Sequence, residues 1–157
     1  MLVVCDKDYR LSGRLKIREE QDPCPNDEEV LIKVKSFGIN RPDILQKKGL
    51  YPPPASASKI LGLECSGFVE KTGKKVKGIK EGDTVCALTA GGAYAEKVSV
   101  HQWHCFNIPK ALAFSEAAVL PEVFMTCWTN IFELGILKQG DSILIHGGHS
   151  GIGCAAI

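Results

Sequence analysis

The chain has 157 residues, of which 45% are apolar and 24% charged, proportions typical of one globular domain rather than of a disordered or fibrous chain. Its formal net charge of +1 gives no long-range field that would attract nucleic acid or a membrane surface, so we expect neither as a partner. The sequence also lacks a signal-peptide core and any run of about 20 apolar residues, which predicts a cytoplasmic protein whose partner is a small molecule.

Cysteine usage is consistent with that location. The cysteines are odd in number and scattered, without a C-x-x-C pair, so they predict reduced and mostly buried thiols rather than a disulfide framework or a zinc knuckle. They are Cys5, Cys24, Cys65, Cys86, Cys105, Cys127 and Cys154.

Short β-segments separated by turn residues fill the chain up to about Lys110, a pattern that favours a sandwich or barrel. The clearest strand is 28–40, where Val30, Ile32 and Val34 alternate with Leu31 and two lysines at the period of a pleated ribbon. Further strands are expected within residues 1–5, 14–20, 60–70, 83–89 and 92–100.

Two loops interrupt these strands. Residues 71–83 carry five lysines among glycines, and we interpret them as a solvated hairpin and loop, because no aromatic residues interleave with the lysines as nucleic-acid binding would require. Residues 51–58 read YPPPASAS, and three prolines fix the backbone there, which predicts a stiff loop that holds Tyr51 in a defined place.

The character of the sequence changes after Pro109. Residues 115–137 have helix-length apolar runs, with Ser115 placed to cap, Glu116 in the first turn and Pro121 dividing the segment into two helices. Residues 141–146 (DSILIH) are a short β-branched run that predicts a buried parallel strand and the start of a second domain.

A glycine-dense turn follows that strand. Gly148, Ser150 and Gly153 occupy the positions of G-x-G-x-x-G, where the first residue allows a sharp turn, the second a close approach to pyrophosphate and the third close packing of helix on strand. Such turns also occur without a ligand, and the residue that would recognise the ribose, about twenty residues further on, lies beyond Ile157. Ser150 either donates its hydroxyl to a phosphate or is simply small enough for the backbone to approach.

Several motifs carry a resemblance to a known superfamily. They are NRPD at 40–43, GLYPPPASASKILGLECSG at 49–67, EGDTV at 81–85, GGAYAEKV at 91–98, AAVLPEVFMTCW at 117–128 and ILIHGGHSGIG at 143–153. The chain resembles the medium-chain dehydrogenase/reductase superfamily and, within it, the zinc-independent NADPH quinone oxidoreductases; the tyrosine–proline segment is most similar to their tumour-suppressor-inducible branch.

The resemblance implies a mainly β fold with short helices. A GroES-like β-barrel catalytic domain would span residues 1–120, and residues 121–157 would form connecting helices and the first strand and partial helix of a truncated Rossmann α/β domain. The resemblance places the positions at which the zinc enzymes of the superfamily hold their catalytic metal at Asn40, Leu63 and Glu122. Because Leu63 cannot ligate and Asn40 is a feeble substitute for a thiolate, we expect no metal.

The resemblance also assigns site residues. Asn40, Asp43, Tyr51 and Glu64 would line the catalytic cleft and Thr126 would touch the nicotinamide. NADPH would further lie against the glycine turn, formed by Gly147, Gly148, His149, Ser150, Gly151, Ile152 and Gly153. Structural alternatives stay open, since Asp43 could cap a short helix, Glu64 could be a buried structural carboxylate and Thr126 could serve in helix packing.

The activity implied is hydride transfer from NADPH to a quinone, a reaction that needs no Lewis acid because the quinone ring disperses the incoming charge. A 2-alkenal or enoyl reductase acting on a conjugated carbonyl is the nearest enzymatic alternative, and a crystallin-like or RNA-binding role is the alternative of another class. The sequence is expected to be the N-terminal part of a longer protein, inactive alone, whose full-length form is a homodimer.

Overall fold

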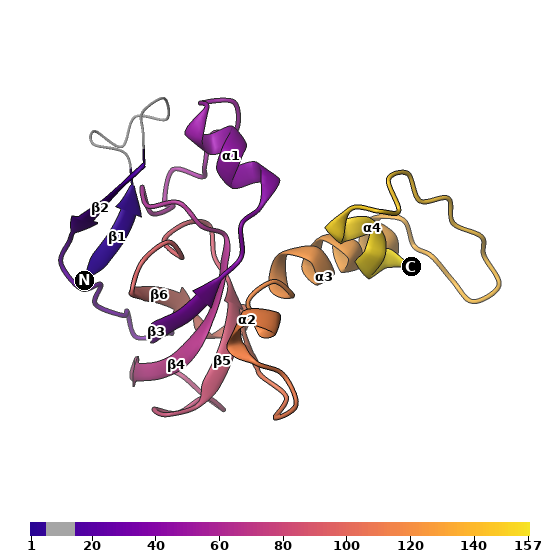
Figure 1. Cartoon of the computed structure of the whole chain (residues 1–157). Coiled ribbons are helices and arrows are strands. Elements are labelled where there is room, and N and C mark those ends of the chain that lie inside the picture. The colour runs from indigo at the N-terminus through magenta and orange to yellow at the C-terminus, as the bar shows by residue number, and fades with distance from the viewer. Residues whose placement is uncertain (6–14) are drawn as a thin grey trace. The chain divides into compact units, whose positions relative to one another are not determined.

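The computed structural model describes residues 1–5 and 15–157 (Figure 1). The chain divides into two compact units, Met1–Val119 and Leu120–Ile157. The seven strands of the described residues all lie in the first unit. Among those same residues, no helix is long and apolar enough to cross a membrane.

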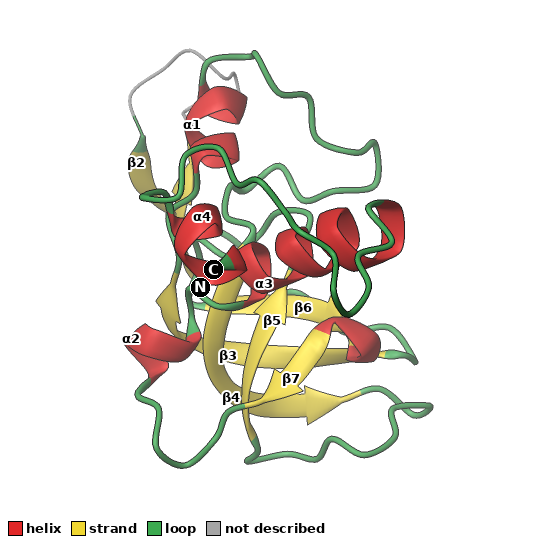
Figure 2. Cartoon of the chain, turned by 90° about the vertical axis from the view of Figure 1, so that its right-hand side faces the viewer, coloured by secondary structure: helices red, strands yellow, loops and turns green. Residues whose placement is uncertain are grey.

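A five-stranded antiparallel sheet forms the centre of the first unit (Figure 2). Its strands follow the order β6-β3-β4-β5-β7 and are β3 (Glu29–Phe37), β4 (Glu64–Thr72), β5 (Thr84–Leu88), β6 (Lys97–His101) and β7 (Cys105–Asn107). Branched and small side chains of these strands make the core, because they pack well on a pleated surface. Its members include Val30, Ile32, Cys65, Val69, Val85, Ala87, Val98 and Val100.

The alternation expected along β3 is only partly present. Val30 and Ile32 are fully buried as predicted, but Leu31 is also buried, with 3% of its surface exposed. The register between β3 and β4 shifts between Leu31 and Ile32. Leu31 pairs with Lys71 and Ile32 with Val69, so the extra residue is Glu70 of β4, and β3 itself pairs with β6 without a shift. Leu31 and Ile32 therefore point to opposite faces of the sheet, and both faces are covered at this point.

A separate hairpin, β1 (Leu2–Cys5) and β2 (Lys16–Glu19), forms a two-stranded antiparallel sheet. It falls within two of the expected strand segments, although residue 14 of the second segment lies outside the described residues. Val3 forms a bridge to Ala95, and with Cys5 these residues make a second small core. The hairpin is thereby joined to the rest of the first unit.

Short helices complete the first unit. They are α1 (Arg41–Lys47), the 3-10 helix η1 (Gln102–His104) and α2 (Phe114–Ala117). The lysine-rich segment 71–83 ends β4 and leads to β5, and all five of its lysines are exposed. The sequence did not indicate η1 or β7, because segments of three residues leave no periodicity to detect.

The helical part of the chain differs from expectation in one detail. Pro121 begins α3 (Pro121–Cys127), as its fixed φ favours, and the π-helix η2 (Trp128–Leu134) follows. Ser115, however, does not cap α2: the N-cap is Ala113, whose N–H donates to the Glu116 carboxylate over 2.7 Å. Ser115 is the second residue of the helix, two positions after the N-cap, and the acidic side chain of the first turn satisfies the helix end instead.

The predicted strand at 141–146 is not formed. Residues 141–145 have no regular secondary structure, and a turn leads from them into α4 (Gly151–Ala156). A strand exists only through ladder hydrogen bonds to a neighbour, and the described residues of the second unit contain no other strand. The β-branched run does not form a strand by itself, because no partner strand for it is present in these residues.

Candidate active site

The site begins where β3 ends and α1 starts. Asn40 is the N-cap residue of α1, and Asp43, three residues further on, accepts a hydrogen bond from the Asn40 backbone N–H at its Oδ2 over 2.8 Å. Asp43 therefore does cap this helix, as one of its open interpretations held. It is also 98% buried, with 2% of its surface exposed, which is unusual for a carboxylate whose only task is capping.

A second buried carboxylate lies next to Asn40. Glu64, the first residue of β4, is 1% exposed, and its Oε1 accepts a hydrogen bond from the Asn40 side-chain amide over 2.8 Å. The Gly38 N–H also donates to the Glu64 carbonyl oxygen over 3.3 Å. Asn40 thus binds Asp43 through its backbone and Glu64 through its side chain.

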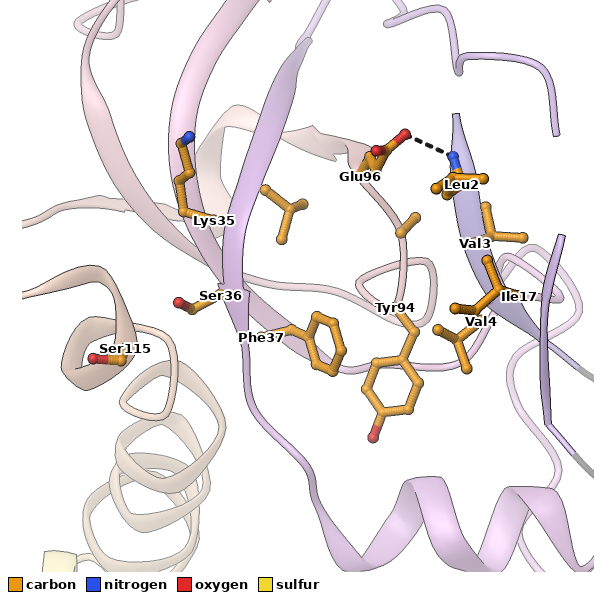
Figure 3. A pocket seen from close by; sticks show the side chains of 12 residues that line it. Leu2, Val3, Val4, Ile17, Lys35, Ser36, Phe37, Tyr94, Glu96 and Ser115 are labelled. Carbon is orange, nitrogen blue, oxygen red and sulfur yellow. Dashed lines mark hydrogen bonds between the residues drawn. The ribbon is translucent and has the colours of Figure 1, made fainter. Parts of the chain in front are cut away.

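Tyr94 joins these residues from the segment before β6. Its hydroxyl donates to Asp43 Oδ2 over 2.9 Å, and its ring lies against Phe37 with centroids 4.6 Å apart. Figure 3 shows both rings on the wall of a cavity of about 530 Å³, with the hydroxyl of Tyr94 directed away from the Phe37 ring. Burial raises the pKa of the Tyr94 hydroxyl, and the neighbouring Asp43 charge adds to the effect, so this hydroxyl is a neutral donor.

Sequence reasoning missed Tyr94 as a member of the site. The signal was available, because Tyr94 stands inside the GGAYAEKV motif, but the motif was used only to support the resemblance. Nothing in the spacing of the sequence shows that residue 94 meets residue 43.

The structure brings together three of the four predicted catalytic residues, namely Asn40, Asp43 and Glu64. Tyr51 is not bonded to them: it is 46% exposed and follows the C-terminal end of α1, where the Leu50 N–H donates to the Leu45 carbonyl. Asn40 is at the other end of that seven-residue helix, about 10 Å away along its axis. The catalytic role of Tyr51 stays a prediction.

Two of the three positions that would hold zinc, Asn40 and Leu63, carry unsuitable chemistry. Leu63 is buried and apolar, and the amide nitrogen of Asn40 is engaged with Glu64. Neither offers the thiolate or imidazole that zinc prefers. Within residues 1–5 and 15–157, no three side chains of His, Cys, Asp or Glu gather as a possible metal site.

The predicted dinucleotide turn lies in the second unit. Gly147 has a φ of 72°, so the left-handed residue is Gly147 rather than Gly148. Ser150 is the N-cap of α4, and its Oγ accepts a hydrogen bond from the Gly153 N–H over 3.0 Å. Gly153 is buried, and a Cβ there would overlap the Gly147 carbonyl oxygen.

This geometry fits a pyrophosphate in part. The close packing at Gly153 is the task predicted for the third glycine. With the Gly153 N–H satisfied by Ser150, the N–H groups of Gly151 and Ile152 are the donors at this end of α4. The Ser150 hydroxyl keeps its own hydrogen for a phosphate oxygen, and His149 is exposed in the same turn.

A cavity of about 520 Å³ within the second unit brings two further predicted residues together. Thr126 and Ile152 both line it. The Cys127 thiol, next to Thr126, donates to the Ile152 carbonyl over 3.4 Å, which connects α3 to α4. The structure therefore brings the predicted nicotinamide contact Thr126 to the same cavity as a residue of the glycine turn.

Comparison with known proteins identifies the family of the chain. Residues 26–110 match the alcohol dehydrogenase GroES-like domain, which is more than half of the chain. The chain therefore belongs to the alcohol dehydrogenase GroES-like domain family, within the medium-chain dehydrogenase/reductase superfamily of oxidoreductases. The fold is the mainly β architecture with short helices that the resemblance implied.

Three relatives illustrate the range of that superfamily. The chain is 37% identical over 143 residues to a mouse synaptic vesicle membrane protein VAT-1 homolog-like protein, covering 91% of the chain and 34% of that relative. It superposes on the CurK enoyl reductase with a TM-score of 0.86 and 28% identity, over 99% of the chain and 49% of that structure. It superposes on the Escherichia coli quinone oxidoreductase complexed with NADPH with a TM-score of 0.81 and 30% identity, over 99% of the chain and 47% of that structure.

The chain thus spans about a third of the length of the curated relative and about half of each solved structure.

Proposed function

We propose that this chain is the catalytic domain of a zinc-independent reductase that transfers a hydride from NADPH to a quinone. Its tyrosine–proline segment resembles that of the tumour-suppressor-inducible quinone oxidoreductase. The observation that carries the proposal is the pair of side chains at the zinc positions, the buried Leu63 and an Asn40 whose amide is bound to Glu64. Without a Lewis acid the enzyme needs an acceptor that disperses charge, and a quinone does so.

The cofactor and the residues of the chain would have different roles in the reaction. NADPH, when bound, supplies the hydride. Thr126 and the turn from Gly147 to Gly153 would hold it, while Asn40, Asp43 and Glu64 form a fixed polar wall whose side chains need not reorganise. Tyr51, exposed on its proline-stiffened loop, would donate a hydrogen bond to the acceptor oxygen on which charge develops.

A conjugated carbonyl is the second candidate acceptor. It is supported by the structural similarity to the CurK enoyl reductase and by the same charge dispersal, since hydride addition to the β-carbon of an enone gives an enolate whose charge is shared by the α-carbon and the oxygen. We further propose a cytoplasmic protein that acts as a homodimer when joined to its complete dinucleotide-binding domain.

A chimera tests the proposal. Residues 1–157 replace the matching first half of the Escherichia coli quinone oxidoreductase, and the loss of NADPH absorbance is followed with a benzoquinone, an open-chain enone or an aldehyde as acceptor. We expect the largest kcat/KM with the quinone. A preference for the enone would replace the first candidate with the second, and turnover of the aldehyde alone after addition of zinc would refute both.

Two variants of the same chimera test Tyr51. Tyr51→Phe keeps the ring and removes the donor, so we expect kcat to fall by more than about tenfold with an unchanged melting temperature. Tyr51→Ala removes both and should also raise KM. Full activity of both variants, with a lower melting temperature for Ala, would make Tyr51 a packing residue.

A further inference from the structure

The side chain of Tyr94 has little freedom to move. Gly62, with a φ of 103°, lies beneath it, and a Cβ at that position would come within 2.5 Å of the Tyr94 ring. The Tyr94 N–H donates to the Leu61 carbonyl over 2.9 Å, and the Val4 N–H donates to the Tyr94 carbonyl over 2.7 Å. With Phe37 against the ring, both the backbone and the ring of Tyr94 are held in place.

The Asp43 carboxylate depends on this fixed hydroxyl. Its Oδ2 accepts two hydrogen bonds, from Tyr94 and from the Asn40 N–H, whereas its Oδ1 is buried and has no partner among the described residues. Two donors on one oxygen set the orientation of the whole carboxylate. If the Tyr94 hydroxyl is removed, a carboxylate that is 2% exposed retains one donor and is free to rotate about its last bond.

The effect extends to Glu64 through Asn40. The Asn40 N–H points at Asp43 while its side-chain amide points at Glu64, so a shift of Asp43 moves the residue that holds the second carboxylate. We propose that Tyr94 is a positioning residue of the candidate site, which through Asp43 fixes the place of Asn40 and hence the Asn40–Glu64 hydrogen bond. Its consequence for turnover rests on the proposed function.

The positioning itself can be tested on the 157-residue chain by nuclear magnetic resonance. Tyr94→Phe keeps the ring contact with Phe37 and removes the hydroxyl. The matched control, Phe37→Leu, weakens the ring contact and keeps the hydroxyl. Hydrogen exchange of the Asn40 backbone N–H is measured relative to that of Ile32, which is fully buried in β3 between β4 and β6, so that any general loss of stability cancels.

In Tyr94→Phe, the exchange of Asn40 relative to Ile32 should rise about tenfold or more, and the side-chain amide signals of Asn40 should move. In Phe37→Leu both exchange rates should rise together. Unchanged Asn40 signals and an unchanged ratio in Tyr94→Phe would overturn the proposal. Should Tyr94→Phe fail to fold, Asp43→Asn tests the same connection, with the same readout and the same overturning result.

Turnover of the chimera separates this inference from the proposed function. There Tyr94→Phe should lower kcat several-fold with little change in KM, because Tyr94 does not touch the acceptor. A moved Asn40 amide in a chimera that reduces no acceptor would support the positioning and refute the function. An active chimera in which the Asn40 amide signals do not move would support the proposed function and refute the positioning role of Tyr94.

Discussion

Gly38 is the residue on which the place of Glu64 most directly depends. It lies just after β3, and its φ is not in the left-handed region. Glycine is therefore required there because a side chain would not fit, and not because of the backbone conformation. A Cβ at this position would overlap the Glu64 carboxylate and come within 2.8 Å of its Cγ. The carboxylate reaches Asn40 only because this position has no side chain.

Gly38→Ala should therefore destabilise the first unit by about 2–3 kcal/mol, since it forces a buried, hydrogen-bonded carboxylate to move. Urea unfolding measures the change. Gly78→Ala is the control: Gly78 has a φ of 76° and no atom near its Cβ position, so only backbone strain of about 1 kcal/mol is expected. An equal loss of unfolding free energy in the two variants would show that Glu64 moves without an energetic penalty.

At the scale of elements, one ion cluster connects four segments of the first unit. The Lys97 ammonium, at the start of β6, bonds to Asp22 over 2.7 Å and to Glu70 of β4 over 2.8 Å. The amino group of Met1, next to β1, lies 3.1 Å from the same Asp22. Both cations hold the pKa of the Asp22 carboxyl below its ordinary value of 3.8.

The pH dependence of stability should follow from that lowered pKa. Because the folded value lies below the unfolded one, the contribution of Asp22 is complete above the unfolded value and is lost as the pH falls through the folded value. Asp22→Asn should thus be less stable than the natural chain at pH 7, and the two unfolding curves should converge as the pH falls below the ordinary carboxyl value of 3.8 and through the lowered folded value.

Asp27→Asn provides the comparison for Asp22. Asp27 lies 3.7 Å from Lys75 with both side chains mostly exposed, and a pair of that kind contributes little. We expect its stability to follow that of the natural chain at every pH. A difference between Asp22→Asn and the natural chain that stays constant as the pH falls from 7 until the Asp22 carboxyl is protonated in the folded chain would mean that charge is not the cause.

At the scale of the whole molecule, the two units differ in how completely they are built. The first has a five-stranded sheet and a continuous core. The second holds its glycine turn against α3 through the Cys127 contact, with Leu144 and Ile157 more than 80% exposed. A phosphate turn is aimed by the sheet and helix on either side of it, and residues 141–145 pair with no strand.

The 157-residue chain should consequently bind NADPH more weakly than about 100 μM, a loss of several kcal/mol relative to a site with nanomolar affinity. Calorimetry on the isolated chain measures this, and the chimera is the positive control, because it restores a complete domain after the same turn. Micromolar affinity of the isolated chain would show that the turn and α4 suffice.

Much of the fold was predictable because its signals are local. The strand β3, the proline at the start of α3 and the glycine turn before α4 each depend on residues a few positions apart. The bulge of β4 opposite Leu31 and Ile32, the two short elements η1 and β7, and the cap at Ala113 were not predicted, because a segment of three residues or a single shift in register leaves no period to detect. The strand expected at 141–146 was wrong because its formation requires a neighbour.

The sequence by itself determined the chemical identity of the side chains proposed for the candidate site, because that identity is fixed before the chain folds. It has Leu63 and Asn40 at two positions where the resemblance would place zinc ligands, and it supplies the carboxylates of Asp43 and Glu64. Only the tertiary structure decided which of these side chains come into contact. Both carboxylates become buried when β4 and the segment before β6 pack beside the β3–α1 corner. The same packing brings Tyr94 into contact with Asp43, 51 residues away along the chain, and such long-range packing has no local signal in the sequence.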